Sequence, residues 1–452
     1  MYLVYSLLLT LGLIVLIPRF LLQAIAHGKY LPGLRQRLGS IPQLSESTQP
    51  TVWLHCVSVG ETQAARPFVR ELRKQLPDCR LVVSTVTVTG QKVANAVFKN
   101  EAAEIVYFPI DWAWCVRRSL RAIDPDVVLM LETELWPNFL RHCRKRGVPV
   151  AVINGRISKK SYSGYSLIGF FVRRILKDIN LAVMQTEADC ERIRSLGMSR
   201  SHSIVGGNLK FDAGPPAKCD ALTEQIRSRF DLRANVPLIL AASTHAPEER
   251  IIVDSFKMLT ARNHAPMRLA IAPRHPERFA EVASVLEKSG LRWVRRSSAP
   301  HPNDVDVEAI LFDSIGELTS IYPLSTMVFV GGSLVEKGGH NVLEPAAAGV
   351  PVITGAHTDN FESIVQMLQE HDAIIKLPPF EQPEVITALR DAFTSLLTSE
   401  ERRSQLASNA LQLLEMNRGV AEKTLELVTP LFQLAEVRTN SNVGLAGEAA
   451  NS

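Results

Sequence analysis

The chain has 452 residues, of which 46% are hydrophobic and 21% are charged, so most of it is expected to form globular domains. This length is typical of two domains of about 200 residues each. A formal net charge of +4 is too small to favour nucleic acid as a partner. Six cysteines without any Cys-x-x-Cys spacing argue against a disulfide framework.

The N-terminal segment is apolar. Residues 1–17 carry no charged side chain, and Pro18 and Arg19 follow them. Such a run is at the short end of the length that spans a membrane. Basic residues come after it and not before it, which argues against a cleaved signal peptide and favours a cytoplasmic body. We predict a membrane anchor helix over residues 1–25 that either spans the membrane or lies in its surface; a buried helix is the alternative.

Short apolar runs alternate with helical patterns twice along the chain, as is typical of βαβ units with parallel sheets. The Gly- and Pro-rich segment 206–217 separates the two sets. We predict an α/β fold of two Rossmann-like, doubly wound domains that face each other across a cleft. The predicted strands are 51–57, 80–86, 104–108, 126–131, 148–153 and 180–184 in the first domain, and 237–243, 267–272, 309–312, 326–330, 350–354 and 373–376 in the second. The predicted boundaries are 26–212 for the first domain, 213–437 for the second and 438–452 for a disordered tail.

A carboxylate follows the first predicted strand. Gly60 permits a tight turn from this strand into a helix, which puts Glu61 at the end of the sheet where ligands of such folds bind. Glu61 is therefore a candidate general base. A helix N-terminus lowers the pKa of a carboxyl group, so this role requires compensating burial. The alternative is an acid that only stabilises its helix.

Two more charged loops end in the predicted cleft. Glu132 and Glu134 follow the strand at 126–131, and strand alternation predicts that only one of them faces the cleft. Lys210 lies in the predicted hinge, where a cation can reach an anionic substrate. A single lysine is usually solvated, but two carboxylates and a lysine at three loop ends favour a shared site.

The most informative stretch is 331–351, GGSLVEKGGHNVLEPAAAGVP, which follows a predicted strand. Its glycines let a phosphate approach the backbone, and Asn341 is a favoured N-cap of a helix that offers free N–H groups to an anion. Glu344, one turn later, suits two ribose hydroxyls. Arg274 follows another strand and suits phosphate or carboxylate. This pattern indicates a nucleotide-holding loop.

Other motifs are missing or have ordinary explanations. The chain has no Walker loop, GxGxxG, HExxH or GxSxG motif. Its two Asp-x-Asp strings, at 124–126 and 304–306, are explained by solvated loop and strand-start acids, so no metal is predicted. Basic and aromatic residues interleave between 156 and 177, which fits a surface for anionic lipid headgroups as well as it fits a solvated amphipathic helix.

The assembled strings resemble the 3-deoxy-D-manno-octulosonic acid (Kdo) transferases of lipopolysaccharide synthesis over residues 1–430. The strings are LHCVSVGET, LETELWPN, GNLKFD, APRHPERF, GELTSIY and FVGGSLVEKGGHNVLEPAAAGVPV. The resemblance implies a GT-B glycosyltransferase that moves Kdo from CMP-Kdo to a lipid A precursor, with inversion and without a metal or cofactor. It also implies the cytoplasmic face of a bacterial inner membrane, whose lipid surface is a further partner.

The resemblance implies roles for individual residues. Glu61 becomes the general base, and Glu132 and Lys210 become a charge-stabilising pair. The implied CMP contacts are Pro273, Arg274, Ile315, Gly316, Glu317, Asn341, Val342, Leu343 and Glu344. Some relatives have Met at the position of Ile315 and Pro at that of Val342, a departure that matters little for backbone contacts. Two alternatives stay open: a GT-B enzyme that uses a UDP-sugar, and a non-catalytic, membrane-anchored nucleotide- or lipid-binding protein.

Overall fold

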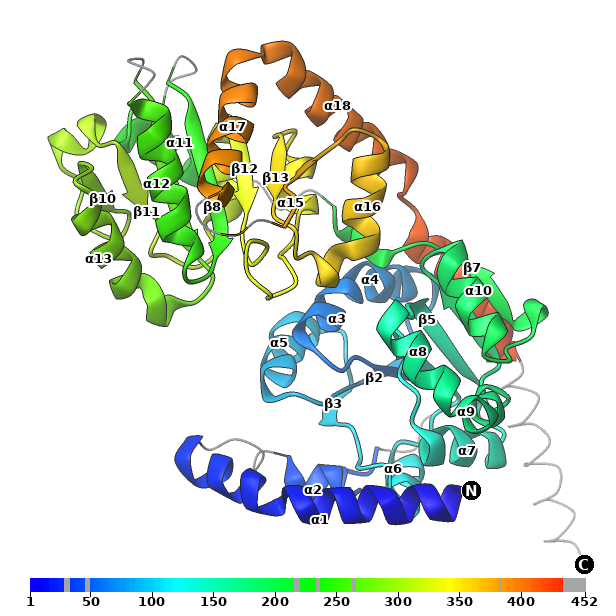
Figure 1. The fold of residues 1–452 in the computed structure, drawn as a ribbon. Helices are drawn as coiled ribbons and strands as arrows, with labels where there is room; N and C mark the ends of the chain where they lie inside the picture. The colour runs from blue at the N-terminus through cyan, green and yellow to red at the C-terminus, as the bar shows by residue number, and fades with distance from the viewer. Residues whose placement is uncertain are drawn as a thin grey trace, which may run out of the picture. The chain divides into compact units, whose positions relative to one another are not determined.

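The computed structural model describes residues 1–27, 33–44, 49–214, 220–232, 236–261, 266–379, 381 and 384–433, and the side chains of 17–27 lie outside this description. The chain divides into two compact units (Figure 1). The first comprises residues 1–213 and 419–452, and the second comprises residues 214–418.

The first unit is built on a seven-stranded parallel sheet in the order β3-β2-β1-β4-β5-β6-β7. The order reverses between β1 and β4, which makes the carboxyl ends of these two strands the switch point where ligands bind in doubly wound folds. The strands are β1 Thr51–His55, β2 Arg80–Thr85, β3 Glu104–Tyr107, β4 Val127–Leu131, β5 Val150–Gly155, β6 Leu181–Met184 and β7 Ser203–Val205.

Helices cover both faces of this sheet, and their apolar sides form two cores. One core gathers Leu54, Phe68 and Leu129, and the other gathers Trp53, Val128 and Phe139. The helices are α1 Tyr2–His27, α2 Leu34–Arg37, α3 Val59–Ala64, α4 Arg66–Gln75, α5 Val88–Phe98, α6 Ala113–Ile123, α7 Pro137–Lys145, α8 Lys159–Leu167, α9 Gly169–Leu176 and α10 Glu187–Ser195, with 3₁₀ turns η1 Arg200–His202 and η2 Leu209–Ala213.

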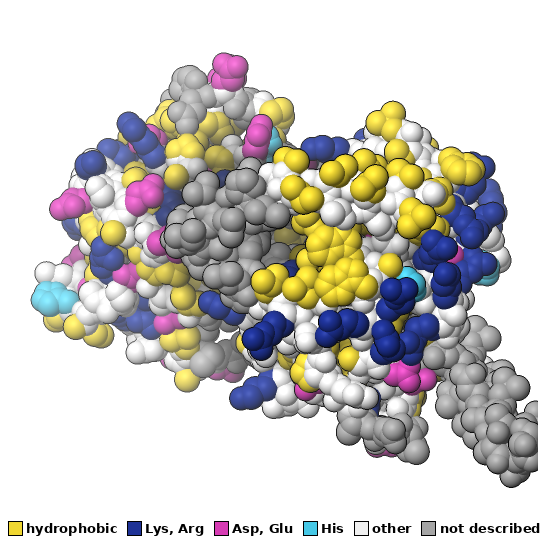
Figure 2. All heavy atoms as spheres, turned by 90° about the horizontal axis from the view of Figure 1, so that it is seen from below, with side chains coloured by type: hydrophobic (Ala, Val, Ile, Leu, Met, Phe, Trp, Pro, Cys, Tyr) yellow, Lys and Arg dark blue, Asp and Glu magenta, His cyan; other side chains and the backbone are white. Residues whose placement is uncertain are grey.

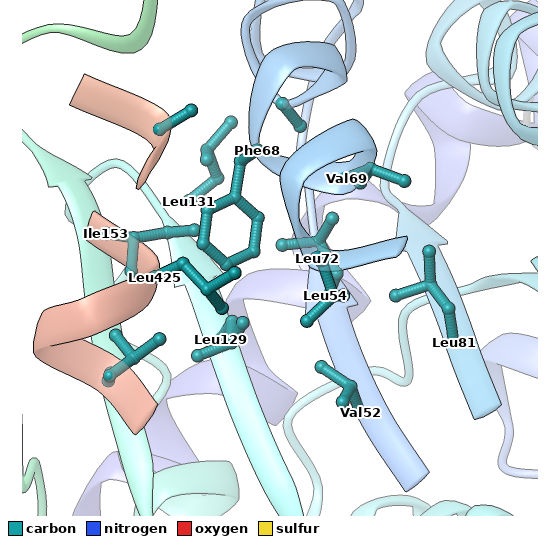
Figure 3. Close-up of a cluster of buried hydrophobic side chains, with 14 of the residues drawn as sticks. Val52, Leu54, Phe68, Val69, Leu72, Leu81, Leu129, Leu131, Ile153 and Leu425 are labelled. Atoms are coloured by element: carbon teal, nitrogen blue, oxygen red, sulfur yellow. The ribbon is translucent and has the colours of Figure 1, made fainter. Parts of the chain in front are cut away.

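The C-terminal segment from Gly419 returns to the first unit. The backbone N–H groups of Gly419 and Ala421 donate to the Asp212 carboxylate at 2.8 and 2.5 Å. Leu425 is fully buried and packs beside Phe68 and Ile153 (Figure 3). The sequence-based boundaries assign 213–437 to the second domain, whereas this segment completes the core of the first unit.

The second unit repeats the architecture with a parallel sheet in the order β10-β11-β9-β8-β12-β13-β14. Its strands are β8 Leu238–Thr244, β9 Arg268–Pro273, β10 Trp293–Arg295, β11 Ala309–Leu311, β12 Met327–Val330, β13 Val352–Thr354 and β14 Ile375–Lys376. Its helices are α11 Asp220–Arg229, α12 Glu248–Thr260, α13 Phe279–Ser289, α14 Leu318–Ile321, α15 Leu343–Ala347, α16 Glu362–Glu370, α17 Glu384–Thr398 and α18 Glu400–Met416, with 3₁₀ turns η3 Pro276–Arg278, η4 Pro302–Asp306, η5 Tyr322–Leu324 and η6 Asp359–Phe361.

The predicted α/β architecture with two parallel sheets is confirmed. Each predicted apolar run contains a strand, and the sequence missed only β7 and β10 among the described strands, which are three residues long and partly exposed. The facing of the two domains across a cleft stays a prediction. The predicted tail at 438–452 lies outside the described residues.

The prediction for residues 1–25 holds for a helix but not for a membrane span. Helix α1 runs from Tyr2 to His27. Across the described part of the chain, no helix combines the length and the apolar character needed to cross a bilayer. The transmembrane part of the prediction is therefore not supported.

We expect Leu425→Ala to destabilise the protein by about 2–5 kcal/mol, because it removes a fully buried side chain and leaves a cavity in the core of the first unit. Leu411→Ala is the matched control, since Leu411 lies on α18 with 44% of its surface exposed. Urea unfolding of both variants measures the difference. Equal midpoints for the two would show that the C-terminal segment does not belong to this core.

Candidate active site

Glu61 lies in the first turn of α3, directly after β1. The backbone N–H of Val57 donates to its Oε2 at 2.8 Å, and the hydroxyl of Ser58, the N-cap of α3, donates to its Oε1 at 2.9 Å. Only 7% of Glu61 is exposed. Burial raises the pKa of this carboxyl to about 8; the charge of Glu132 adds to the rise, and the two hydrogen bonds oppose it. The structure therefore supplies the burial that a general base at this position requires.

Glu132 and Glu134 follow β4. Glu132 has a φ of +56°, and its backbone N–H donates to the carbonyl oxygen of Ile153 at 3.0 Å. Burial raises the pKa of Glu134 to about 7, and the charge of Glu132 adds to this rise. Both carboxylates act electrostatically on Glu61. Strand alternation predicted one such group; the left-handed backbone at Glu132 ends the alternation, so both lie near Glu61.

Lys210 belongs to η2 and joins this acidic group. Burial lowers the pKa of its ammonium group, and the charges of Glu132 and Glu61 oppose that shift. Arg156 also acts on it and lowers the pKa further. The first unit thus brings together Glu61, Lys210 and both of the carboxylates that follow β4, where the sequence predicted only one of these two.

A buried amide network sets the position of the Lys210 backbone. Asn154, which has a φ of +52° in β5, accepts a hydrogen bond from the Leu209 N–H on its Oδ1 at 2.9 Å. The Gln185 side chain donates to the Asn154 carbonyl at 3.1 Å and accepts from the Asn208 amide at 2.9 Å. The Asn208 Oδ1 in turn accepts from the backbone N–H of Lys210 at 3.1 Å. Neutral amides therefore fix the lysine without adding charge.

In the second unit, Arg274 lies at the carboxyl end of β9, just after the buried Pro273. Its backbone N–H donates to the Thr244 carbonyl at 3.0 Å, which ties it to the end of β8. The exposed guanidinium is close enough to Glu344 and His340 to lower the pKa of both. Arg274 and Glu344, predicted from separate loops, therefore lie in one group.

Glu344 is held by two neighbours. The Asn341 amide donates to its Oε1 at 3.0 Å, and the Tyr322 hydroxyl donates to its Oε2 at 3.5 Å. Burial raises the pKa of Glu344, and these two hydrogen bonds with the Arg274 charge oppose the rise. These two hydrogen bonds fix the position of its carboxylate.

The predicted cap of the following helix is different in the structure. Val342 is the N-cap of α15, and the Asn341 Oδ1 accepts from the Leu343 N–H at 3.0 Å. Helix α15 has only five residues, so its dipole is weaker than the sequence suggested. Val342 and Leu343 are buried.

The turn Ile315-Gly316-Glu317 precedes α14. Ile315 is 81% exposed, and Gly316 has a φ of +86°. Glu317 forms an ion pair with Arg296 at 3.0 Å. The chain then continues through α14 to Tyr322, which contacts Glu344 as described above.

Glu248 is a structural anchor of the site loop that the sequence reasoning missed. It is fully buried in the first turn of α12, and its carboxylate accepts four backbone hydrogen bonds of 2.7–2.9 Å. The donors are the N–H groups of His245, Gly332, Ser333 and Leu334. The sequence contained a sign of this residue. The string THAPEE at the end of β8 resembles SVGE after β1, because each places an acid in the first helical turn after the first strand of its sheet.

A hydrogen-bonded pair of histidines also connects the end of β8 to the loop after β12. The Nε2 atoms of His245 and His340 lie 2.8 Å apart, and their ring centroids lie 5.1 Å apart with planes at 11°. These values describe two rings that are nearly coplanar and meet edge to edge, so one Nε2 donates and the other accepts. Burial lowers the pKa of His340 to about 4, and burial also lowers that of His245. The pair is therefore neutral near pH 7.

Within the described residues, no three or more His, Cys, Asp or Glu side chains are arranged to hold a metal ion. The absence of a metal from the reaction stays a prediction.

Residues 32–213 match the family described as 3-Deoxy-D-manno-octulosonic-acid transferase (kdotransferase), and residues 225–413 match glycosyl transferases group 1. The 3-deoxy-D-manno-octulosonic acid transferase of Haemophilus influenzae is 34% identical over 413 residues, which cover 91% of this chain and 94% of that protein. The enzyme of the same name from Bordetella pertussis is 31% identical, covering 83% of this chain and 86% of that protein.

Solved structures extend the likeness of the fold. The UDP-GlcNAc 2-epimerase of Neisseria meningitidis superposes with a TM-score of 0.55 at 14% identity, covering 85% of this chain and 100% of that one. A glycosyltransferase from Rickettsia africae gives 0.55 at 12% identity, covering 86% and 99%. At these identities the comparison shows the fold alone, which is of the GT-B type.

We expect Glu248→Ala to destabilise the second unit by at least about 3 kcal/mol, because four backbone N–H groups lose their acceptor and each such loss costs about 1–3 kcal/mol. Hydrogen–deuterium exchange of peptides from 331–341 measures the loosening of this loop, and a thermal melt measures stability. Glu336→Ala, at an exposed position of the same loop, is the control. Unchanged exchange in Glu248→Ala would contradict the anchoring role.

Proposed function

Because the chain belongs to the 3-deoxy-D-manno-octulosonic acid (Kdo) transferase family and is a glycosyltransferase of lipopolysaccharide synthesis, we propose that it moves Kdo from CMP-Kdo to the sugar hydroxyl of a lipid A precursor. The observation that carries the proposal is the buried carboxylate of Glu61, whose raised pKa and neighbouring charges suit a general base at neutral pH.

Glu61 acts as the base in the proposed reaction. It accepts the proton of the acceptor hydroxyl while the hydroxyl oxygen bonds to the anomeric carbon of Kdo. The bond from that carbon to the phosphate oxygen breaks at the same time, and CMP leaves with the bonding electrons. Attack from the face opposite the leaving group inverts the anomeric centre.

Glu132 and Lys210 form the charge-stabilising pair in this proposal. The Lys210 ammonium is suited to the anionic groups of the donor, which carries a phosphodiester and a carboxylate. The negative charge of Glu132 raises the pKa of Glu61, which strengthens Glu61 as a base. It also opposes the loss of the lysine charge on burial. The charge of Glu132 thus acts to raise the pKa of both Glu61 and Lys210.

The second unit holds CMP in this proposal. Arg274 binds the phosphate, and Glu344 binds the ribose hydroxyls with Asn341 holding its carboxylate in place. Pro273, Ile315, Gly316, Glu317, Val342 and Leu343 complete the contacts. A monophosphate leaving group carries less charge than a diphosphate, so this site is proposed to work without a metal.

The acceptor is a lipid, so the protein is proposed to act at the cytoplasmic face of a bacterial inner membrane. The exposed apolar face of α1 supports this location: Leu3, Leu7 and Val15 are 85%, 60% and 76% exposed. Membrane contact here requires no span.

We expect Glu61→Gln to lower turnover of CMP-Kdo with a lipid A precursor by about 10²–10⁴-fold, because glutamine keeps the shape of the side chain but cannot accept the proton. Mass spectrometry of the lipid after incubation measures the transfer. CMP binding, measured by calorimetry, is expected to be unchanged. Near-normal turnover would contradict the assignment of the base.

The same assay separates the open alternatives. Transfer from a UDP-sugar but not from CMP-Kdo would favour the second GT-B reading. Binding of CMP or lipid without any transfer by the unmodified protein would favour the non-catalytic one.

We expect kcat/KM to rise with pH through a midpoint near 8, because Glu61 must lose its proton to act as a base and its pKa is raised to about 8. Glu132→Gln removes the neighbouring negative charge, so the midpoint should move to lower pH even though the maximal rate falls. Initial rates between pH 5 and 9.5 measure both effects. A midpoint that does not move in Glu132→Gln would rule out the electrostatic coupling.

A further inference from the structure

Helix α1 is fastened to the first unit by polar side chains on one of its faces. Tyr2, Ser6 and Thr10 are spaced four residues apart and therefore lie along one stripe of the helix. Each makes a hydrogen bond to a different part of the body: Tyr2 Oη to Asp178 Oδ2 at 2.9 Å, Asn138 Nδ2 to Ser6 Oγ at 3.0 Å and Trp112 Nε1 to Thr10 Oγ1 at 3.0 Å.

Aromatic contacts reinforce the start of this stripe. The ring of Phe171 on α9 lies 6.3 Å from that of Tyr2 and 5.9 Å from that of Tyr5, measured between centroids. The Arg141 guanidinium on α7 lies 4.3 Å from the centroid of the Tyr2 ring. Asp178 is buried and also bonds to Arg144 at 2.9 Å. The first turns of α1 are therefore held against α7 and α9.

The opposite face of α1 is apolar and uncovered. Among the described side chains of α1, the exposed large apolar ones are Leu3, Val4, Leu7, Leu8, Leu11, Ile14, Val15 and Leu16. A helix that keeps its polar stripe on the body and exposes these apolar side chains has the pattern of an interfacial helix.

The turn between α8 and α9 continues this apolar face. Leu167 and Phe170 are 89% and 85% exposed, and Ile168 between them is also exposed. Phe171, the next residue, is the one that packs on Tyr2 and Tyr5. The turn and the start of α1 are therefore neighbours on the surface, and Figure 2 shows an apolar patch bordered by Lys and Arg side chains.

Cations on α6, α7 and α9 lie beside the patch. Burial lowers the pKa of His142 to about 4, and the positive charges of Arg117, Lys145 and Arg141 contribute to this fall. These three cations therefore lie near His142. The charge of Arg174 on α9 lowers the pKa of Tyr2. The two acids that α1 contacts are buried: Asp111, which accepts from Tyr5, and Asp178. The rim of the patch is thus complementary to anionic headgroups.

We propose that α1 lies in the plane of a membrane, fastened to the body by Tyr2, Ser6 and Thr10, and that its outer face and the α8–α9 turn insert together among anionic lipids. This inference rests on the proposed function, since a lipid acceptor places the enzyme at a bilayer. The neighbouring arginines and lysines lie at headgroup level in this arrangement, which sets the depth of insertion.

The geometry is incompatible with a helix that crosses the bilayer in this bound form. Tyr2 and Thr10 are eight residues apart, which is about 12 Å along a helix axis. Both are bonded to the body at once. If α1 crossed the bilayer, Tyr2 would lie on the side of the membrane opposite the body. Its hydrogen bond to Asp178 would then have to break.

Binding is tested by flotation of the full-length protein with vesicles of phosphatidylethanolamine alone or with phosphatidylglycerol. We expect at least tenfold tighter binding to the anionic vesicles, and a further loss of at least tenfold in the variant Leu7→Asp. Leu411→Asp, at an exposed leucine of the second unit, is the matched control. Binding that ignores lipid charge, or an equal loss in both variants, would overturn the proposal.

Orientation is tested by a fluorescent probe attached to a cysteine introduced at Leu3, Leu7 or Ile14, in a background with Cys219→Ser. The other five cysteines are buried. Positions 3 and 14 lie about 16 Å apart along the helix, so an in-plane helix gives equal, shallow quenching depths at the three sites. Depths that differ by more than about 10 Å would show a crossing helix and overturn the proposal.

Neither test depends on turnover. If Kdo transfer is absent but the protein still binds anionic vesicles with equal probe depths, the proposed function fails and this inference stands. If transfer occurs on a deacylated, water-soluble acceptor while vesicle binding is absent, the inference fails and the proposed function stands.

Discussion

The burial of a carboxylate in the first helical turn after the first strand of each sheet is the constraint on which both halves of the molecule depend. Glu61 follows β1 and Glu248 follows β8, and each strand lies beside the switch point of its sheet. A buried carboxylate is costly unless hydrogen bonds or charges compensate it. The two units compensate the buried carboxylate in different ways, with hydrogen bonds alone at Glu248 and with fewer hydrogen bonds at Glu61.

Glu248 receives four backbone hydrogen bonds, so its oxygens are saturated and it serves as a fixed anchor for the loop after β12. Glu61 receives two hydrogen bonds and lies near the charges of Glu132 and Glu134. Its negative form is therefore less favoured, and its pKa of about 8 lies near the pH at which a base is most useful. The same position in a repeated fold therefore carries a structural anchor in one unit and the proposed general base in the other.

Backbone strain gathers at the same strand ends. Glu132, Asn154 and Ser243 all have φ values between +52° and +57°, a region that residues with a β-carbon enter at a cost. Glu132 bears one of the charges, and Asn154 holds the loop of Lys210. The strained residues thus lie at the carboxyl ends of strands, where the chain turns out of the sheet.

Sequence patterns predicted the parts of the fold that depend on local periodicity. The continuous apolar runs indicated parallel strands, whereas β7 and β10 are partly exposed and are flanked by polar residues or glycine, so no apolar run marks them. The chain boundary at 437 was assigned wrongly because Leu425 completes a core that is formed by residues more than 200 positions away, and no local pattern records that. For the same reason, motif spacing located Glu61 and Glu344 but not the Glu248 anchor or the His245–His340 pair, which depend on contacts between distant loops.

Helix α1, proposed to lie in the membrane, and the loop after β4, proposed to act in catalysis, are linked through α7. The segment that follows β4 begins at Glu132 and ends at Trp136; α7 then begins at Pro137, with Asn138 in its first turn. The Asp111 carboxylate accepts from the N–H groups of Asn138 and Phe139 at 2.9 and 2.8 Å, and the Asn138 amide donates to Ser6 of α1. Helix α1 is therefore bonded to Asn138, just after the C-terminal end of this loop, while Glu132 at its N-terminal end lies near Glu61. The contact proposed to position the enzyme on a lipid surface is therefore six residues along the chain from Glu132, whose charge raises the pKa of the proposed base.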